Sequence, residues 1–418
     1  MTLEPVHIKA ISNLASRIDF SLKDNEIEKA SDLLDLLQEL KHDGKVVLSS
    51  IGKINRGKVD VNRMSQAQDT FDITYSCDSG STNPIVFDSG LYVDFCHCVI
   101  ASTPTDLELH RKRTIVSATY SPSSRVTIST THGWEMFDEG AGRTKIIRIK
   151  PGLLHKRIKR MVHDIALYLA ESEHMLWMLD ENSTERFFIM DGPIYPKQLM
   201  YWMVVESDDI QIRYDPNAKK ILQNYIDIMD YHIEKQIPIV GFVKNPEDMQ
   251  IMHTIKKQVG RPDLPWVLDA QFFKNVLSLD RSVGKNNRYI TYTNWFMQPN
   301  QFYERILNKT SPLVEESLDH RFQKEDYSLT FFMVFVPSMD VVFKIESPYG
   351  ITKNEEMRNM ITRKVLYDIS VSGVPKTLAK ADSVAKIRIS ERCQIIDQFK
   401  TLKVDTRYND VRWGDTDD

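Results

Sequence analysis

Cysteine is scarce in this sequence of 418 residues, with four at positions 77, 96, 98 and 393. They are too few and too irregularly spaced for a disulfide framework. Cys96 and Cys98 flank His97 in a predicted strand, so both thiols share one face and His97 takes the other. A zinc site would need a second Cys/His pair at suitable spacing, and the sequence has none. We therefore expect buried free thiols in a reducing compartment.

Charge of one sign and long apolar runs are also lacking. Lys plus Arg number 54 against 58 for Asp plus Glu, a formal charge of -4. This balance alone does not predict a nucleic-acid partner, although a nuclease can cluster basic groups locally. The most apolar stretch, LTFFMVFVP, is far too short to span a bilayer, and the N-terminus lacks the apolar core of a signal peptide. We expect a cytoplasmic protein with no membrane segment.

The length exceeds that of one compact core, so two domains, or one domain with large additions, are expected. Residues 5–42 have a helical apolar stripe, and residues 72–150 are rich in short strand-like runs. A helix is predicted over 153–179, and strand and helix then alternate as far as a hairpin around 337–339. Two helices, over 354–370 and 375–402, close the chain. This order predicts an α/β fold in which helices cover both faces of a mixed sheet.

Two aspartates each follow an apolar, strand-like run and stand close to a glycine. Asp78 lies in ITYSCDSG and Asp191 in RFFIMDGPIYPK. Ligands gather at strand ends in such sheets, and glycine lets the backbone or a substrate approach closely. If the two strands are neighbours, the carboxylates repel each other, and a bridging divalent cation is the usual resolution. The alternative is that both motifs merely begin turns, which is our interpretation of Asp88 in FDSG.

Further acids lie on predicted helices. Asp382 stands one turn after Leu378, on the apolar side of the helix in VPKTLAKADSVAKI. An acid on a buried helix face must be paired or bind a metal, so a salt bridge and a metal ligand both remain open. Glu171 and Glu173 interrupt a helix that is apolar nearly all round, and periodicity does not choose between them. Asp269, in PWVLDAQFF, is interpreted as a helix N-cap.

Four stretches, in this order, resemble the NurA nuclease family, archaeal DNA-end-processing enzymes that work with the HerA translocase. The stretches are YSCDSGS, the Glu171 helix followed by FFIMDGPIYP, IPIVGFVKNPED, and ESPYG followed by SGVPKTLAKADSVAKI. The similarity covers about residues 70–395 and implies a ribonuclease-H-like mixed sheet, a manganese-dependent site and a homodimer that docks on a hexameric DNA pump. The chain would then divide into a helical N-terminal extension (1–60), a NurA-like nuclease domain (61–403) and a polar tail (404–418).

The resemblance also implies a set of site residues. Matched by position, the first acid is Asp78, the helix acid Glu171 and the strand acid Asp191. The family's C-terminal motif commonly reads Gly-Tyr-Pro, with a histidine eight residues after the tyrosine, and here Val374 and Asp382 stand at those two positions. A carboxylate is a harder ligand than imidazole and suits Mn²⁺ or Mg²⁺. Four carboxylates would then hold two ions about 4 Å apart for in-line displacement at a phosphodiester.

Basic side chains for gripping DNA are expected in two short clusters. The helix segment LLHKRIKRMVHD supplies Lys156, Arg157, Lys159 and Arg160, and ELHRKR supplies Arg111, Lys112 and Arg113. Either cluster could track a phosphate backbone, and the alternative is a solvated face. Lys244, just past IVGFV, is placed to contact a phosphate or orient water, unless it is simply a solvated lysine. Trp295 and Phe296 could stack on bases or pack in the core.

Together these features predict a metal-dependent DNA nuclease. We expect 5′–3′ exonuclease and single-strand endonuclease activity on DNA ends in double-strand break repair, with a HerA-type hexameric ATPase as partner. The chain has no Gly-x-x-x-x-Gly-Lys-Ser/Thr loop, so energy for translocation would come from that partner. One alternative is a catalytically inactive subunit of the same fold that caps the pump or holds single strands. Another is a nuclease acting on RNA.

Overall fold

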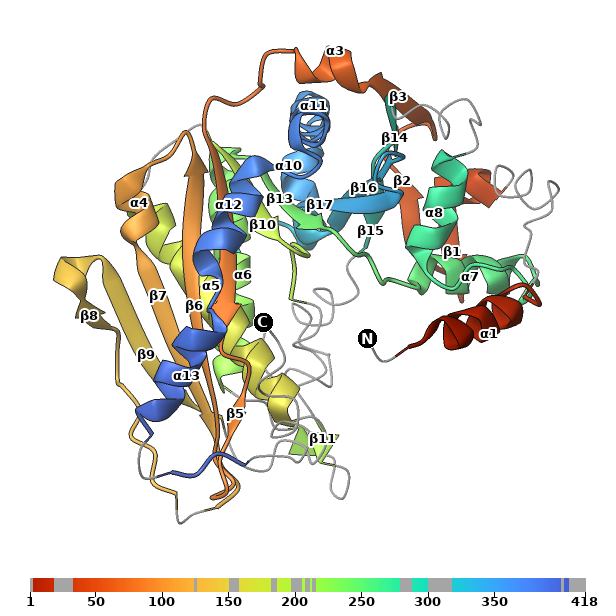
Figure 1. The fold of residues 1–418 in the computed structure, drawn as a ribbon. Helices are drawn as coiled ribbons and strands as arrows, with labels where there is room; N and C mark the ends of the chain where they lie inside the picture. The colour runs from red at the N-terminus through yellow and green to blue at the C-terminus, as the bar shows by residue number, and fades with distance from the viewer. Residues whose placement is uncertain are drawn as a thin grey trace.

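The computed structural model describes residues 3–18, 33–123, 126–149, 158–181, 186–196, 205–206, 211–212, 216–278, 288–299, 318–399 and 402–405. Within these ranges, one large sheet forms the centre of the molecule and helices surround it (Figure 1). No helix of the described residues combines the length and apolarity that crossing a bilayer demands. Three expected features, Lys156, Arg157 and most of the polar tail, lie outside the described residues.

The strands, in chain order, are β1 (Glu39–His42), β2 (Lys45–Ser50), β3 (Arg56–Asp60), β4 (Thr74–Ser81), β5 (Ile85–Val86), β6 (Tyr92–Thr103), β7 (Arg113–Tyr120), β8 (Glu135–Phe137), β9 (Gly142–Arg148), β10 (Phe187–Asp191), β11 (Val205–Glu206), β12 (Gln211–Ile212), β13 (Ile239–Val243), β14 (Tyr289–Thr293), β15 (Phe296–Gln298), β16 (Leu329–Val336) and β17 (Val341–Pro348). The helices are α1 (Pro5–Ala15), α3 (Val61–Ser65), α4 (Leu107–Arg111), α5 (Ile158–Glu181), α6 (Pro216–Lys235), α7 (Gln250–Gln258), α8 (Asp269–Leu277), α10 (Tyr349–Thr352), α11 (Glu355–Ser372), α12 (Lys376–Ala385) and α13 (Ile389–Asp397).

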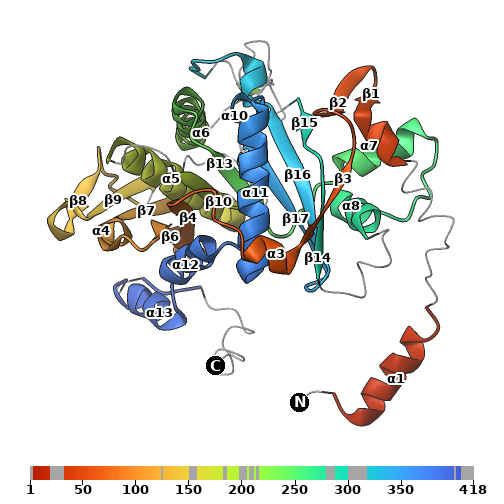
Figure 2. The same cartoon turned by 90° about the horizontal axis from the view of Figure 1, so that it is seen from above.

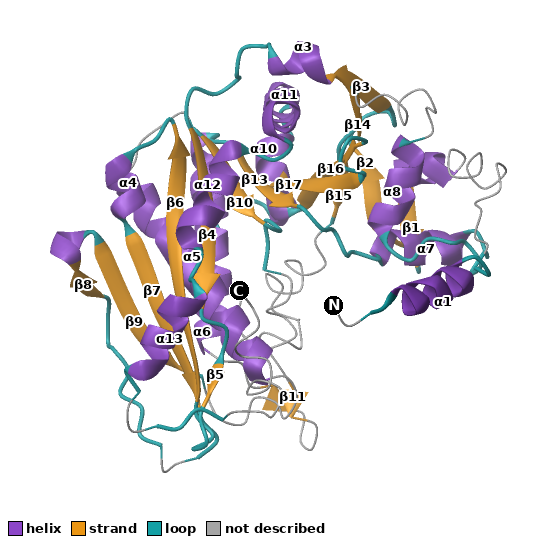
Figure 3. Cartoon of the chain, in the orientation of Figure 1, coloured by secondary structure: helices purple, strands orange, loops and turns teal. Residues whose placement is uncertain are grey.

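The large sheet is mixed, as predicted. Its 15 strands follow the order β1-β2-β15-β16-β17-β13-β10-β4-β6-β7-β9-β8, with β3, β5 and β14 pairing beside this path (Figure 3). Strand β10 is parallel to both β4 and β13, and β7 is parallel to β9. The other pairs of this sheet are antiparallel. Three parallel strands therefore occupy its middle.

Helices cover both faces of the half of the sheet that contains β4 and β6. Helices α5 and α6 lie on one face, and α12 and α13 lie on the other (Figure 2). The predicted helix over 153–179 is confirmed as α5 within the described residues. Its apolar residues point in most directions because it contacts β4, β6 and β7 as well as α6. This sandwiching explains why the sequence shows no single apolar stripe there.

Strand β16 explains the most apolar run of the sequence. Alternate residues point to opposite faces of a strand. Phe332 and Val334 join the larger core, whereas Phe331 and Met333 join a second core with α7 and α8. Every residue of β16 is buried, so both faces must be apolar. The predicted hairpin of β16 and β17 is confirmed by their antiparallel pairing.

The prediction that residues 5–42 are helical throughout is wrong at its carboxyl end. Helix α1 spans Pro5–Ala15, but Glu39–His42 is strand β1. Leu37 and Leu40, both 0% exposed, enter the core from a short 3₁₀ turn and from β1, where Leu40 pairs with Leu48 of β2. The spacing of Leu37 and Leu40 alone is too short a pattern to establish a helix. Pairing with β2 overrides the helical preference of this segment. Strands β1 to β3 join the large sheet, and the division at residue 60 stays a prediction.

The helix predicted over 375–402 is two helices, α12 and α13. They are separated at Lys386, whose backbone is extended with φ -60° and ψ 121°. Past the break, Ile395, Ile396 and Phe399 pack on a small core around Phe87. The residues around Lys386 include no glycine or proline that would predict the break.

Several single-residue interpretations also have outcomes. Trp295 and Phe296 are 6% and 0% exposed and pack in the cores, so base stacking is excluded for these buried rings. Asp269 does cap a helix, but a neighbouring one: its carboxylate accepts hydrogen bonds from the amides of Ile251 and Met252 at the start of α7. In α8 itself Asp269 is the first helical residue and Leu268 is the N-cap, so the expected N-cap position is wrong by one residue.

Three of the four cysteines and Asp88 behave as expected. Cys77, Cys96 and Cys98 are buried free thiols, and Cys393 is free and exposed. Asp88 is exposed in the turn between β5 and β6. These residues therefore lend no support to a zinc site or to a role for Asp88 as a ligand.

The close packing of α12 on β4 generates a prediction. A Cβ at Gly80 would clash with the carbonyl oxygen of Ala385, at the end of α12. We expect Gly80→Ala to lower the free energy of unfolding by about 1–3 kcal/mol, because backbone atoms cannot yield without moving the helix. Urea unfolding measures this change. Gly133→Ala is the matched control, since no atom lies within 4 Å of its added Cβ. Equal stability of the two variants would contradict the packing described.

Candidate metal centre

The candidate site lies where the parallel strands at the middle of the sheet end. In β10, Met190 pairs with Cys77 of β4, and Asp191 pairs with Phe242 of β13. Carboxyl ends of neighbouring parallel strands meet at one edge of a sheet, which is where such folds place ligands. Because Asp191 and Asp78 each follow that Met190–Cys77 pair by one residue, they project from the same face. The expectation that their two strands are neighbours is confirmed.

One detail of the expected strand ends is wrong. Asp78 was expected to follow its strand, but β4 continues to Ser81, which pairs with Cys96 of β6. The partner on the other side, β10, ends at Asp191. Asp78 therefore lies at the point where β4 loses one neighbour and keeps the other. Its side chain is only partly buried there, even though its backbone is still in a strand.

Two glycines shape the turn after β10. Gly192 has φ +111°, a conformation that favours glycine, and its amide donates to the carbonyl of Phe242. A Cβ at Gly241 of β13 would meet the amide nitrogen of Ile194 at 2.5 Å. The absence of side chains at both positions lets the turn fold back against β13. This tight turn holds Asp191 at the edge of the sheet.

Three carboxylates converge at this edge. Asp78, Asp191 and Asp382 each offer an oxygen, and these oxygens all lie within 4.8 Å of one another. Asp382 comes from α12, which packs across β4. Its expected position on the buried face of that helix is wrong: Leu378 and Ala381 are buried, whereas Asp382 is exposed. It needs no buried partner, because it reaches the cluster from the solvent side.

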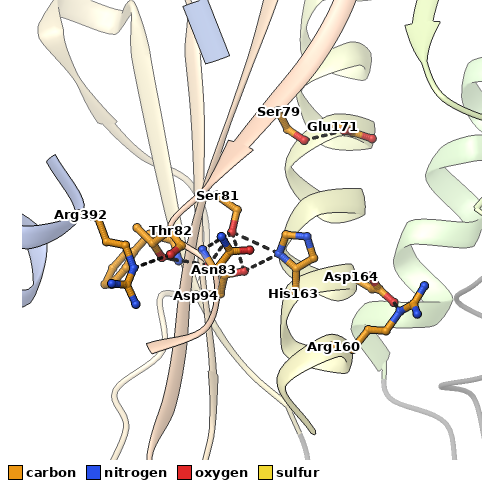
Figure 4. Close-up of polar contacts among 11 residues, drawn as sticks. Ser79, Ser81, Thr82, Asn83, Asp94, Arg160, His163, Asp164, Glu171 and Arg392 are labelled. Carbon is orange, nitrogen blue, oxygen red and sulfur yellow. Dashed lines mark hydrogen bonds and ion pairs between the residues drawn. The ribbon is translucent and has the colours of Figure 1, made fainter. Parts of the chain in front are cut away.

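The fourth expected carboxylate, Glu171, is not part of this mutual group. Its Oε1 accepts a hydrogen bond of 2.6 Å from Ser79 Oγ, on the α5 face of β4 (Figure 4). Because Asp78 and Ser79 are adjacent in β4, their side chains point to opposite faces. Glu171 thus lies on the α5 face of β4, whereas Asp78 points to the opposite face. The negative charges of Asp78 and Asp191 still raise its pKa, after burial has contributed most, to about 8.

The structure separates Glu171 from Glu173, which the sequence pattern left open. Glu173 is 9% exposed and accepts a hydrogen bond from Asn224 at 3.1 Å. It also lies 3.9 Å from the guanidinium of Arg143. These contacts engage Glu173 in packing between α5, α6 and β9. Of the two acids, only Glu171 interacts electrostatically with the aspartates.

The carboxylates of the aspartate cluster repel one another. Burial and then the charge of Asp191 raise the pKa of Asp78 to about 7. Burial also raises the pKa of Asp191, although Lys244 opposes that effect. The ammonium of Lys244, just past β13, lies 2.6 Å from Asp191 Oδ2. One lysine therefore offsets part of the negative charge, and much of the repulsion remains for a cation to relieve.

The donor set suits a hard divalent cation. Oxygen ligands from carboxylates are those that Mg²⁺ and Mn²⁺ prefer, and the raised pKa of Asp78 shows that its charged form lacks compensation. Asp78, Asp191 and Asp382 would hold such an ion. Glu171 would complete the shell only if it left Ser79 or if a second ion bound beside it.

The expected DNA-binding residues lie in different settings. Lys159 and Arg160 are exposed at the amino-terminal end of α5, and Arg160 lies 3.7 Å from Asp164. Arg111 is exposed on α4, within 4 Å of Glu108 and Asp138. Arg113 is less available, because its guanidinium donates to the backbone carbonyls of His110 and Lys112. Lys112 lies over the ring of Trp177.

Sequence reasoning missed the polar residues that hold the site's surroundings. Ser79 positions Glu171, and its only signal was its place beside Asp78 in the CDSG motif. Two residues further along β4, Ser81 donates to Asp94, whose carboxylate lies 2.9 Å from Nδ1 of His163 on α5 (Figure 4). Asp94 is 0% exposed, so this contact ties α5 to β4 and β6. Nothing in the local sequence of Asp94 or His163 indicates that pairing.

The structure combines a mixed, helix-covered sheet with a cluster of carboxylates that could hold a metal ion. The family model described as NurA domain matches residues 72–387. The chain therefore belongs to the NurA family of nucleases, as its sequence motifs indicated. Among curated proteins, no match was found.

Solved structures similar to this chain include three of NurA proteins. The NurA nuclease from Sulfolobus solfataricus is 11% identical, with a TM-score of 0.46, over 96% of this chain and 97% of that one. A structure of NurA with manganese is 9% identical, with a TM-score of 0.43, over 94% and 97%. NurA bound to dAMP and manganese is 11% identical, with a TM-score of 0.39, over 82% and 90%.

The raised pKa of Asp78 predicts a pH dependence of stability. In metal-free protein the pKa of Asp78 is raised to about 7, so the folded state holds its proton up to that pH, whereas the unfolded state releases it near the ordinary aspartate pKa of 3.8. The unfolding free energy should therefore fall as pH rises from about 4 to 7. Asp78→Asn should reduce that fall, because it carries no charge to repel. Urea midpoints in EDTA at pH 5 and pH 8 measure this, with Asp88→Asn as the control. An identical pH dependence for Asp78→Asn and wild type would contradict the repulsion.

Proposed function

We propose that this chain is a metal-dependent DNA nuclease that hydrolyses phosphodiester bonds at the Asp78–Asp191–Asp382 cluster. The observation that carries the proposal is the convergence of three carboxylates, from β4, β10 and α12, within 4.8 Å of one another. The convergence joins parts of the chain that are more than a hundred residues apart. Membership of the NurA family supports the same reading. NurA proteins have been solved with manganese, which is consistent with Mn²⁺ as the ion.

The proposed role of each residue of the site follows from its chemistry. A bound divalent ion would supply Lewis-acid polarisation of the scissile phosphate and a bound water that ionises more readily. Asp78 and Asp191 hold the ion from the rigid sheet, and Asp382 holds it from the solvent side. Lys244, already 2.6 Å from Asp191, is close enough to the cluster to contact a phosphate oxygen. Glu171, held by Ser79, is placed to keep a proton or to bind a second ion.

Finer features of the activity are proposed from the family resemblance. They are 5′–3′ exonuclease and single-strand endonuclease activity, a homodimer, and action on DNA ends in double-strand break repair with a HerA-type hexameric ATPase. A NurA protein has been solved with dAMP and manganese, which is consistent with a DNA substrate. The four-carboxylate, two-ion site is likewise a proposal, in which Glu171 supplies the fourth group.

Phosphate contacts away from the cluster are proposed for the exposed basic residues. Arg160 lies 11 residues before Glu171 on α5, about 16 Å along the helix axis at 1.5 Å per residue. That distance corresponds to several nucleotides of a strand leading away from the cluster. Arg111 offers a second exposed contact on α4. Lys156, Arg157 and Lys159 remain proposed members of the α5 group, and Arg113 is the weakest candidate because backbone carbonyls engage its guanidinium.

The second candidate function is an inactive subunit of the same fold. The observation in its favour is that Glu171 bonds to Ser79 and stays outside the mutual carboxylate group. Such a chain would bind single-stranded DNA or cap a pump without cleaving.

Cleavage by the cluster is testable with two ligand variants. Purified protein is incubated with end-labelled single- and double-stranded DNA and RNA, in Mn²⁺ or in EDTA. We expect Mn²⁺-dependent cleavage of DNA. Asp191→Ala should reduce the cleavage rate at least about 100-fold, because removing a residue that only orients a metal ligand can already cost that much activity, and Asp191 is itself a proposed ligand. Asp88→Ala, in a similar Asp-Ser-Gly setting but outside the cluster, should leave cleavage unchanged.

The outcomes of that assay separate the candidate functions. Cleavage in EDTA, or a fully active and folded Asp191→Ala, would overturn the metal mechanism. Binding without cleavage in every metal tested would favour the inactive subunit. Cleavage of RNA but not DNA would overturn the proposed substrate.

The position of Asp382 generates a separate prediction. We expect Asp382→His to keep activity within about 100-fold of wild type, because an imidazole, the family's usual group, also binds Mn²⁺. Asp382→Ala should lose more. Initial rates over a series of Mn²⁺ concentrations distinguish weaker metal binding from slower chemistry. A folded Asp382→His that is as inactive as Asp382→Ala would show that carboxylate charge is required there.

A further inference from the structure

Helix α12 carries the one acid of the aspartate cluster that does not come from the sheet. The helix lies over β4 and β6 and also contacts β10 (Figure 1). Asp78 and Asp191 are fixed by strand pairing, but Asp382 keeps its place only if this helix keeps its orientation. The contacts that hold α12 against the sheet therefore decide whether the third carboxylate meets the other two.

Apolar packing alone resists rotation of α12 about its own axis only weakly. The buried apolar side chains of the helix are Leu378, Ala381 and Ala385. Two of these three are single methyl groups, which make few contacts with the strands beneath. At the radius of about 5–6 Å that helix side chains reach, a rotation of about 20° would move the Asp382 carboxylate by about 2 Å. A group that holds a metal ion must stay within about 0.5 Å of its productive position.

Lys380 restrains that rotation by hydrogen bonds. Its Nζ donates to the backbone carbonyl of Ser102 at 2.9 Å and to the hydroxyl of Thr105 at 2.5 Å. Both acceptors belong to the end of β6 and the turn that follows it. Hydrogen bonds from a charged donor are stronger than those between neutral groups. Thr377 donates to Thr103 at 2.7 Å and secures the first turn of the helix.

Lys380 and Asp382 lie on opposite flanks of the buried stripe of α12. Two residues correspond to about 200° around a helix axis, and the buried Leu378 and Ala381 lie between the two flanks on the side that faces the sheet. A rotation that lifts one flank from the sheet lowers the other. Any rotation that displaces Asp382 by about 2 Å would therefore displace Lys380 by a similar amount and break its hydrogen bonds.

We propose that Lys380 is a positioning residue for Asp382 in the metal centre. It acts from the far flank of α12 and touches neither the ion nor the substrate. This role rests on the proposed metal-dependent function. A charge effect would have the opposite sign, because a lysine near the site repels a cation. Loss of the charge alone would tighten metal binding, whereas loss of the hydrogen bonds weakens it.

Binding of Mn²⁺ alone to the full chain, measured by calorimetry without DNA, tests the proposal. We expect Lys380→Met to raise the Kd for Mn²⁺ about tenfold, at the lower end of what groups that orient metal ligands contribute. Lys380→Arg, whose guanidinium also donates to two acceptors, should stay within about threefold of wild type. Lys376→Met is the matched control, because it removes the same charge from an exposed position one turn earlier. It should not weaken Mn²⁺ binding.

A double-mutant cycle tests whether Lys380 acts through Asp382. In an Asp382→Ala background, Lys380→Met should leave the Kd for Mn²⁺ unchanged within about twofold, because no third carboxylate is left to position. An equal weakening in both backgrounds would overturn the positioning role. Binding by Lys380→Met that is as tight as in wild type, or tighter, would overturn it as well.

A second variant keeps the test independent of folding, which urea unfolding checks for each protein. Thr105→Val removes one acceptor of Lys380 at an exposed position, so we expect a folded protein. Its Kd for Mn²⁺ should rise about threefold for the loss of one hydrogen bond. If Lys380→Met does not fold, an unchanged Kd in Thr105→Val overturns the proposal. A wild-type protein that binds no Mn²⁺ would instead overturn the proposed metal centre, and this role with it.

Discussion

The parallel pairing of β10 with β4 is the constraint on which the candidate site depends. Its register, with Met190 opposite Cys77, places Asp191 and Asp78 on one face and at one edge. A shift of one residue would turn Asp191 to the α5 face and bury Met190 against α12. That slip is opposed because it would carry the charged Asp191 to the face of the sheet that α5 covers. Packing of the core therefore fixes the distance between two charges.

The third acid depends on a different interface. Asp382 reaches the cluster because α12 approaches β4 closely enough for Gly80 to face the carbonyl of Ala385. Leu378 and Ala381 hold the helix on the sheet, and the exposed side of α12 then presents Asp382. Small residues at this contact thus set the position of a charged one. The sheet supplies two of the carboxylates with little freedom, and a helix packed across it supplies the third.

Much of this arrangement was predictable because it follows from local pattern. Apolar runs ending in Asp-Gly or Asp-Ser-Gly marked the strand edge, and the alternation of strand and helix gave the mixed sheet. What could not be predicted depends on partners distant in the chain. The choice between Glu171 and Glu173 is made by Ser79 and Arg143, the strand at Leu40 by pairing with β2, and the break at Lys386 by the core around Phe87.

In the metal-free protein, the acidic cluster lowers the stability of the fold, although the proposed function requires these acids. Burial and mutual repulsion raise the pKa values of Asp78, Asp191 and Glu171, so their charged forms oppose the folded state. Lys244 and the hydrogen bonds that Ser79 donates to Asp78 and Glu171 compensate only in part. The buried strands beneath must therefore supply the stability that the acids remove. A divalent cation bound at the proposed site would reverse the sign of the effect, because it would bind the folded cluster and not the extended chain. The charge repulsion that destabilises the metal-free protein would thus favour the binding of a divalent cation.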